Sequence, residues 1–157
     1  HRRIRLLPNQ QKYRILIVDD QDSNRLLLRQ LLEPVGLSVR EATTGEAALE
    51  LWQQWHPHLI WLDIRLPGMD GYEVTRQIRT CEQQRPREAG QADQPASPSV
   101  PNPTVIIALT AQALVDDRTL ALAAGCDDYL SKPFQETDLL SKLAQHLQIP
   151  FILAEPE

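Results

Sequence analysis

Two apolar runs of strand length in this sequence each end in carboxylates. Residues 15–18 are followed by Asp19 and Asp20, and residues 59–62 are followed by Asp63. In an open parallel sheet the ligand crevice lies outside the carboxyl ends of the strands, so these acids are expected to converge there. Carboxylates that meet at such an edge repel one another by about 1 kcal/mol or more per pair, and this favours a bound divalent cation. Oxygen-only ligands indicate Mg²⁺, and the pattern predicts a metal-assisted phosphoryl site.

Two more polar side chains follow predicted strands. Thr110 comes directly after residues 106–109, and Lys132 comes shortly after residues 128–130. Taken alone, each acid could serve a turn or a helix cap, and Thr110 could satisfy local backbone groups. The combination favours a site, because four strands then deliver polar groups to one edge of the sheet.

The elements that must position these residues follow a regular alternation. Apolar runs of strand length lie at residues 15–18, 38–41, 59–62, 104–109 and 128–130, and stretches of helical period separate them. The first helical stretch, residues 24–33, carries Leu26, Leu27, Leu28, Leu31 and Leu32, and this stripe is expected to pack against the sheet. The alternation predicts an α/β fold with five strands and five helices.

Length and composition indicate one folded domain with flanking segments. The chain has 157 residues, of which 42% are hydrophobic, enough for a core without disulfides. We expect a linker at residues 1–12, the domain at residues 13–148 and a tail at residues 149–157. Residues 85–103 contain five prolines and read as a disordered insertion at the amino ends of the strands, away from the acids.

The composition argues against several classes of partner. The net charge of -5 and the scattered Lys and Arg residues argue against nucleic acid, which needs clustered basic side chains. No apolar stretch reaches the roughly 20 residues that span a bilayer. Cys81 and Cys126 lack the spacing of a metal site or a redox pair, so we expect reduced thiols and a cytoplasmic setting.

The sequence resembles the receiver domains of two-component response regulators over roughly residues 13 to 148. The positions that carry the resemblance are Asp19, Asp20, Asp63, Thr110, Lys132 and the turn at residues 66–71. The resemblance implies a doubly wound, flavodoxin-like fold with a five-stranded parallel sheet in the order 2-1-3-4-5. It also implies that Asp63 accepts a phosphoryl group from a phosphohistidine on a histidine kinase or a phosphotransfer domain. Such a domain promotes its own phosphorylation and dephosphorylation and is not a separate enzyme.

The resemblance also assigns roles to the residues of the site. The Mg²⁺ ligands would be the side chains of Asp20 and Asp63 and the backbone carbonyl of Arg65, with Asp19 acting through water. Lys132 would hold a phosphoryl oxygen. Thr110 and Tyr129 would form the switch, although Tyr129 taken alone is more simply a core residue. The helix after Asp20 and the turn after Lys132 border the acids, so the donor is expected to dock on Asn24, Arg25, Pro133 and Phe134.

The stretches at residues 13–20, 108–111 and 124–128 look most like those of receivers carried by hybrid sensor histidine kinases. The donor histidine of such a receiver can lie in the same polypeptide or on a separate protein. Only residues 149–157 follow the last predicted helix, too few for a DNA-binding module. A stand-alone regulator and a degenerate receiver that only binds partners are the alternatives.

Two other classes share parts of this pattern. Phosphatases of the haloacid dehalogenase type need a second Asp two residues after the nucleophile, where this chain has Arg65. A flavodoxin-like electron carrier needs a phosphate-binding loop after the first strand, where this chain has acids that would repel phosphate. Both are disfavoured.

Overall fold

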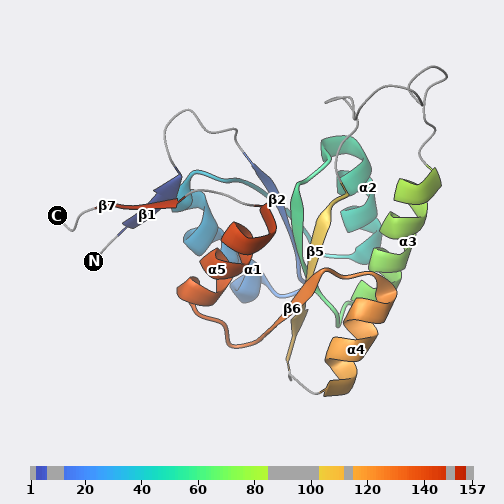
Figure 1. Cartoon of the computed structure of the whole chain (residues 1–157). Coiled ribbons are helices and arrows are strands. Elements are labelled where there is room, and N and C mark those ends of the chain that lie inside the picture. Colours follow the sequence, from blue (N-terminus) through green and yellow to red (C-terminus); the bar gives the residue numbers. More distant parts are fainter. Residues whose placement is uncertain (1–2, 7–12, 85–102, 112–114, 148–150, 155–157) are drawn as a thin grey trace, which may run out of the picture.

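The computed structural model describes residues 3–6, 13–84, 103–111, 115–147 and 151–154 of the chain (Figure 1). The strands are β1 (Arg3–Leu6), β2 (Arg14–Val18), β3 (Ser38–Ala42), β4 (Leu59–Asp63), β5 (Val105–Thr110), β6 (Asp128–Ser131) and β7 (Phe151–Ala154). The helices are α1 (Asp22–Leu32), a short 3-10 helix η1 (Glu33–Val35), α2 (Gly45–Trp55), α3 (Gly71–Gln84), α4 (Val115–Ala124) and α5 (Glu136–Leu147).

Five of the strands form one parallel sheet in the order β3-β2-β4-β5-β6. Counted along the sheet strands alone, this is the predicted order 2-1-3-4-5, so the expected doubly wound α/β fold is confirmed. The order reverses beside β2, where the chain moves outward to β3 and then returns to β4 on the other side. In folds of this kind, ligands bind outside the carboxyl ends of the strands beside such a reversal, which here are β2 and β4.

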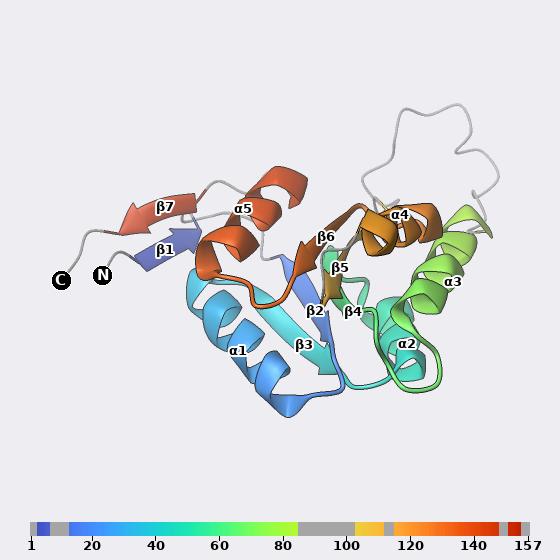
Figure 2. The ribbon, with the colours of Figure 1, turned by 90° about the horizontal axis from the view of Figure 1, so that it is seen from below.

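Helices cover both faces of the sheet. α1 and α5 lie on one face, and α2, α3 and α4 lie on the other (Figures 1 and 2). Residues 15–18 of β2 and 59–62 of β4 have no exposed surface, so the central strands are buried on both faces. This burial explains why their sequences are continuous apolar runs rather than alternating patterns.

The stripe expected along α1 is correct only in part. Leu28 and Leu32 are fully buried and Leu31 packs partly against the core. Leu26 and Leu27 were expected to pack against the sheet as well, but they are 55% and 43% exposed. Three consecutive positions of a helix, such as residues 26–28, already span more than one face, so the three leucines cannot all point at the sheet.

A second, two-stranded sheet joins segments from the two ends of the chain. β1 pairs antiparallel with β7, with Ile4 opposite Leu153 and Leu6 opposite Phe151. Figure 1 places this ribbon beside α1 and α5. The sequence analysis did not predict these strands, which fall in its linker and tail.

The proline-rich segment, residues 85–103, lies outside the described residues except for Pro103. Its neighbours α3 and β5 are described, and β5 begins at Val105, at the edge of the sheet opposite Asp63. In the parts of the chain that the structure describes, no helix is long and apolar enough to cross a membrane.

Candidate active site at the carboxyl edge of the sheet

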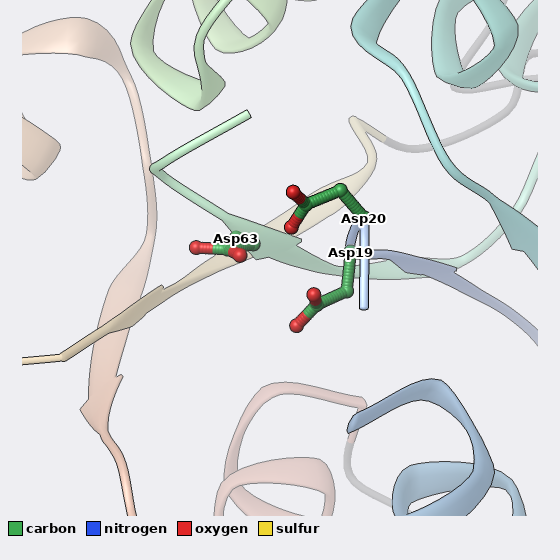
Figure 3. Close-up of side chains that lie close together, drawn as sticks. All are labelled: Asp19, Asp20 and Asp63. Atoms are coloured by element: carbon green, nitrogen blue, oxygen red, sulfur yellow. The ribbon is translucent and has the colours of Figure 1, made fainter. Parts of the chain in front are cut away.

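Three carboxylates meet where β2 and β4 end. Asp19 and Asp20 follow β2, and Asp63 is the last residue of the neighbouring β4 (Figure 3). One carboxylate oxygen from each residue lies within 4.8 Å of the others. Asp19 is fully buried, Asp63 is 7% exposed and Asp20 is open to solvent. The site therefore combines two anchored acids with one that faces the water.

A single ammonium group faces the two buried acids. The Nζ atom of Lys132 lies 3.2 Å from an oxygen of Asp19 and 3.4 Å from an oxygen of Asp63. The backbone N–H of Lys132 donates to the carbonyl of Thr110, 2.7 Å away, which fixes Lys132 beside the end of β5. Lys132 neutralises one of three negative charges, so the site retains a negative surplus that suits a divalent cation.

The backbone holds Asp63 in place. Its Oδ1 atom accepts the backbone N–H of Arg65 at 3.0 Å. Burial raises the pKa of Asp63 above its usual value, and the Asp19 charge acts in the same direction, while the Arg65 N–H and Lys132 oppose them. The ionised form of Asp63 is therefore costly in this fold, and a bound cation would relieve that cost.

The donor set fits Mg²⁺ in its chemistry. All three converging side chains offer carboxylate oxygens, which magnesium prefers, and among the described residues neither His nor Cys joins the cluster.

The turn after β4 is sterically constrained. A Cβ on Gly71 would lie 2.7 Å from the carbonyl oxygen of Asp63, so only glycine allows α3 to begin so close to the site.

Comparisons with known proteins agree with this geometry. Residues 15–88 match the model of the response regulator receiver domain family. The receiver domain of the sensor histidine kinase PA1611 from Pseudomonas aeruginosa is 33% identical, with a TM-score of 0.68, over 88% of this chain and 99% of that one. That structure has a magnesium ion coordinated in its active-site cleft. This chain belongs to the receiver domain family.

Two further proteins are similar to this receiver. The receiver domain of Ssk1 from Saccharomyces cerevisiae, solved together with the histidine phosphotransfer protein Ypd1, is 33% identical with a TM-score of 0.72, over 86% of this chain and 88% of that one. Sensor histidine kinase GacS of Pseudomonas protegens is 37% identical over 126 residues, which are 80% of this chain and 12% of GacS. The receiver spans between 12% and 49% of the length of the curated relatives it matches.

Thr110 ends β5 beside the acids of this receiver. It is 4% exposed, and its hydroxyl has no hydrogen-bond partner among the described residues. A buried hydroxyl without a partner in the protein is uncommon and costs stability. The hydroxyl is a natural donor to an oxygen bound at the site.

Tyr129 lies on the same face of the sheet as Thr110. In β6 it pairs with Ala108, two residues before Thr110 along β5, and residues two apart on a strand share a face. The ring is partly buried, with the Arg118 guanidinium 5.2 Å and the Lys142 ammonium 6.0 Å from its centre. The structure therefore brings the two predicted switch residues to one face, beside α4.

Two residues of the turn after β4 have ordinary local surroundings. Asp70 accepts the backbone N–H of Glu73 at 2.9 Å and so caps α3. The Arg65 side chain is exposed. The metal-ligand role of the Arg65 carbonyl stays a prediction.

The predicted docking residues have different surroundings. Pro133 is exposed and Asn24 is partly exposed, with its amide donating to Gln21. Phe134 packs partly against the core on the α1 and α5 side. Arg25 is only 12% exposed and is held by neighbouring groups. The docking roles stay predictions. The sequence did not indicate that Leu26 and Leu27 are exposed, because all leucines of a leucine-rich helix were expected to face the core.

Proposed function

We propose that this receiver accepts a phosphoryl group on Asp63 from a phosphohistidine, in a step that depends on Mg²⁺. The observation that carries the proposal is the convergence of Asp19, Asp20, Asp63 and Lys132 at the reversal point of the sheet. Membership in the receiver family and the magnesium ion in the related PA1611 receiver support it.

Each residue of the site would have a separate role in phosphoryl transfer. A carboxylate oxygen of Asp63 attacks phosphorus, the bond from phosphorus to the histidine nitrogen breaks, and an acyl phosphate remains on Asp63. The Arg65 N–H fixes the orientation of the Asp63 carboxylate, and Lys132 stabilises charge on the phosphoryl oxygens. Bound Mg²⁺, held by Asp20, Asp63 and the Arg65 carbonyl with Asp19 nearby, would neutralise charge in the transferring group.

The orphan hydroxyl of Thr110 supplies the link from phosphorylation to a change of surface. A phosphoryl oxygen on Asp63 would give this hydroxyl the acceptor it lacks, and Thr110 would move toward it. Tyr129, on the same face and partly exposed, would then turn into the vacated space. The surface formed by α4 and β6 would change as a result.

The donor is a histidine kinase or a histidine phosphotransfer domain, in the same polypeptide or in another. The Ssk1 receiver was solved with such a phosphotransfer protein. Because part of a sensor histidine kinase matches this chain, we favour a hybrid kinase as the parent protein, in the cytoplasm, over a stand-alone regulator. The parent would then be a histidine protein kinase, whereas this domain serves as its phosphoacceptor.

Intact-mass measurement after incubation with acetyl phosphate tests the proposal. Wild type should gain one phosphoryl group in the presence of Mg²⁺ and none after chelation. Asp63→Ala should gain none, whereas Asp70→Asn, which changes an exposed Asp on the same turn, should behave like wild type. If acetyl phosphate fails, a phosphorylated phosphotransfer domain is the second donor. Failure with both donors, or phosphorylation of Asp63→Ala, would overturn the proposal and favour a receiver that only binds partners.

Docking of the donor is tested separately from chemistry. The exposed Leu26 and Leu27 lie on α1, which follows Asp20, beside the predicted docking residue Asn24. Changing both leucines to Ser should slow transfer from a phosphotransfer domain and leave the acetyl phosphate reaction unchanged. The matched control is the exposed pair Leu120 and Leu122 on α4, whose change to Ser should affect neither reaction. Equal effects of the two double variants would contradict docking on α1.

A further inference from the structure

Arg25 lies on the first turns of α1, but its guanidinium does not face the solvent. Its Nη1 atom donates to the backbone carbonyl of Asp19 at 2.8 Å, and its Nε atom lies 3.2 Å from the Glu41 carboxylate. Its Nη2 atom pairs with Asp22. The side chain is 12% exposed. One guanidinium therefore joins the loop after β2, helix α1 and strand β3.

The carbonyl that Arg25 holds has a special position. It belongs to the peptide unit that connects Asp19 to Asp20, and a peptide unit is planar and rigid. Fixing this carbonyl fixes the direction in which the chain leaves Asp19 and enters Asp20. The other groups of Asp19 are held as well, since its N–H donates to Ala42 and its Oδ1 accepts the N–H of Gln21.

We infer that Arg25 is a positioning residue for the acidic pair and that it sets the affinity of the site for Mg²⁺. The inference rests on the proposed metal site, because the pair needs orientation only if it binds a cation. Groups that orient metal ligands from behind are a recurring part of metal sites. Arg suits the role because its planar fork can serve several acceptors at once. This role differs from the docking role that the sequence suggested.

A positioning role and a purely electrostatic role of Arg25 predict opposite changes in Mg²⁺ affinity when the side chain is removed. If Arg25 acted only as a positive charge near the acids, its loss would deepen the negative potential and tighten Mg²⁺ binding. If it orients the acids, its loss lets the Asp19–Asp20 peptide turn and weakens binding. The sign of the change therefore separates the two explanations.

Arg29, which pairs with Glu41 as Arg25 does, offers a matched control. Arg29 is one turn further along α1 and pairs with Glu33 and with Glu41, the carboxylate that also contacts Arg25. Its hydrogen bonds among the described residues go to Glu33, Glu41 and the Val39 carbonyl, and none goes to the acidic pair. Changing Arg29 thus removes an equal charge from the same network without releasing the Asp19 carbonyl.

Isothermal titration of Mg²⁺ into the purified protein provides the test. Arg25→Met keeps an aliphatic stem and loses every donor, and its dissociation constant should rise about tenfold, the lower range for such supporting residues. Arg29→Met should stay close to wild type. Arg25→Lys keeps the charge but not the fork, so its dissociation constant should lie between those of wild type and Arg25→Met. In the acetyl phosphate reaction, Arg25→Met should need more Mg²⁺ for half-maximal rate and should approach the wild-type rate at saturation.

The outcomes are separable. Unchanged or tighter Mg²⁺ binding in Arg25→Met, or an equal loss in Arg29→Met, would overturn the inference and leave the metal site standing. Absence of Mg²⁺ binding in wild type would instead overturn the proposed function. If Arg25→Met fails to fold, as judged by circular dichroism, Arg25→Lys decides, and an affinity equal to wild type would overturn the positioning role.

Discussion

Both edges of the central sheet hold buried polar groups, but the two edges differ in how these groups are paired. At the amino edge, Arg79 donates to the carbonyls of Gly125 and Thr104 and to the carboxylates of Glu82 and Asp127, at 2.7 to 2.9 Å. At the carboxyl edge, three carboxylates share one ammonium, and the Thr110 hydroxyl has no partner among the described residues.

The difference separates structural from functional use of the same kinds of residues. Paired groups at the amino edge connect α3, the start of β5 and the segment before β6, and their hydrogen bonds are made within the protein. Crowded carboxylates and a buried hydroxyl without a partner among the described residues cost stability at the carboxyl edge. Substitutions at the amino edge should therefore lower stability and spare phosphorylation. Substitutions at the carboxyl edge should not lower stability, and they should impair phosphorylation or the structural change that follows it.

Arg79→Ala should give the largest loss of stability. The change removes four hydrogen bonds and leaves Glu82 and Asp127 without their cation, so we expect the free energy of unfolding to fall by about 2 to 3 kcal/mol. Urea titration followed by circular dichroism measures this loss. The rate of phosphorylation by acetyl phosphate, measured on the folded protein without denaturant, should match wild type. A large loss of rate in the folded variant would break the separation between the edges.

Two threonines at opposite ends of β5 sharpen the comparison. Thr104 is buried, accepts the Trp52 Nε1–H at 2.8 Å and donates to the Pro57 carbonyl at 3.3 Å, whereas the buried Thr110 hydroxyl lacks a partner. Thr104→Val should lower the free energy of unfolding by about 1 to 2 kcal/mol, because both groups lose this hydroxyl. Thr110→Val removes a buried hydroxyl without a partner among the described residues, so it should leave the free energy of unfolding unchanged or raise it by up to about 1 kcal/mol.

The two threonine variants should differ in the opposite sense in the structural change that follows phosphorylation. Phosphorylated Thr110→Val should lack the structural change at Tyr129, which can be followed by the fluorescence or NMR signal of that ring. Thr104→Val should retain it. If Thr110→Val were the less stable protein of the two, the hydroxyl would have a partner and the comparison would be wrong.

The sequence predicted the parallel sheet and the convergence of the acids because both follow from local patterns. Continuous apolar runs mark buried parallel strands, and acids placed directly after them must share an edge. The outward-facing Leu26 and Leu27 were not foreseen, because periodicity does not say which face of a leucine-rich helix finds a partner. The contacts of Arg25 with the Asp19 carbonyl and with Glu41 were not foreseen either, because no spacing in the sequence encodes them.

The β1–β7 ribbon illustrates the same limit. Its two strands lie almost the full chain length apart and pair only with each other. Short segments such as Arg3–Leu6 carry too few residues for a convincing strand pattern, and the pairing partner is not a neighbour in sequence. Pairing at long range had to come from the structure.

Neutralising one acid at each edge should change stability with opposite signs. Burial raises the pKa of Asp63, so the folded state disfavours its ionised form, and Asp63→Asn should stabilise the Mg²⁺-free protein at pH 7 by up to about 1 kcal/mol. The advantage should shrink as the pH falls toward the ordinary pKa of Asp63. Asp127→Asn removes the charge that Arg79 faces and should destabilise by roughly 1 kcal/mol. Thermal unfolding with chelator present measures both changes, and destabilisation by Asp63→Asn would contradict the view of a costly acidic site.

The smallest expected effect concerns His58 at the amino edge. Its Nδ1 atom accepts the backbone N–H of Arg14 at 2.9 Å, and burial, assisted by the Arg14 charge, lowers its pKa below the usual 6.5. As the pH falls through 6.5, the unfolded chain takes up a proton at this position before the folded protein does, so stability should fall with it. The loss should stay below about 1 kcal/mol, because the ring is only partly buried. His58→Asn offers an amide oxygen to the same N–H but cannot titrate, so its stability relative to wild type should improve between pH 7 and pH 5 in urea titrations. A constant difference across that range would show that the folded and unfolded states protonate His58 alike.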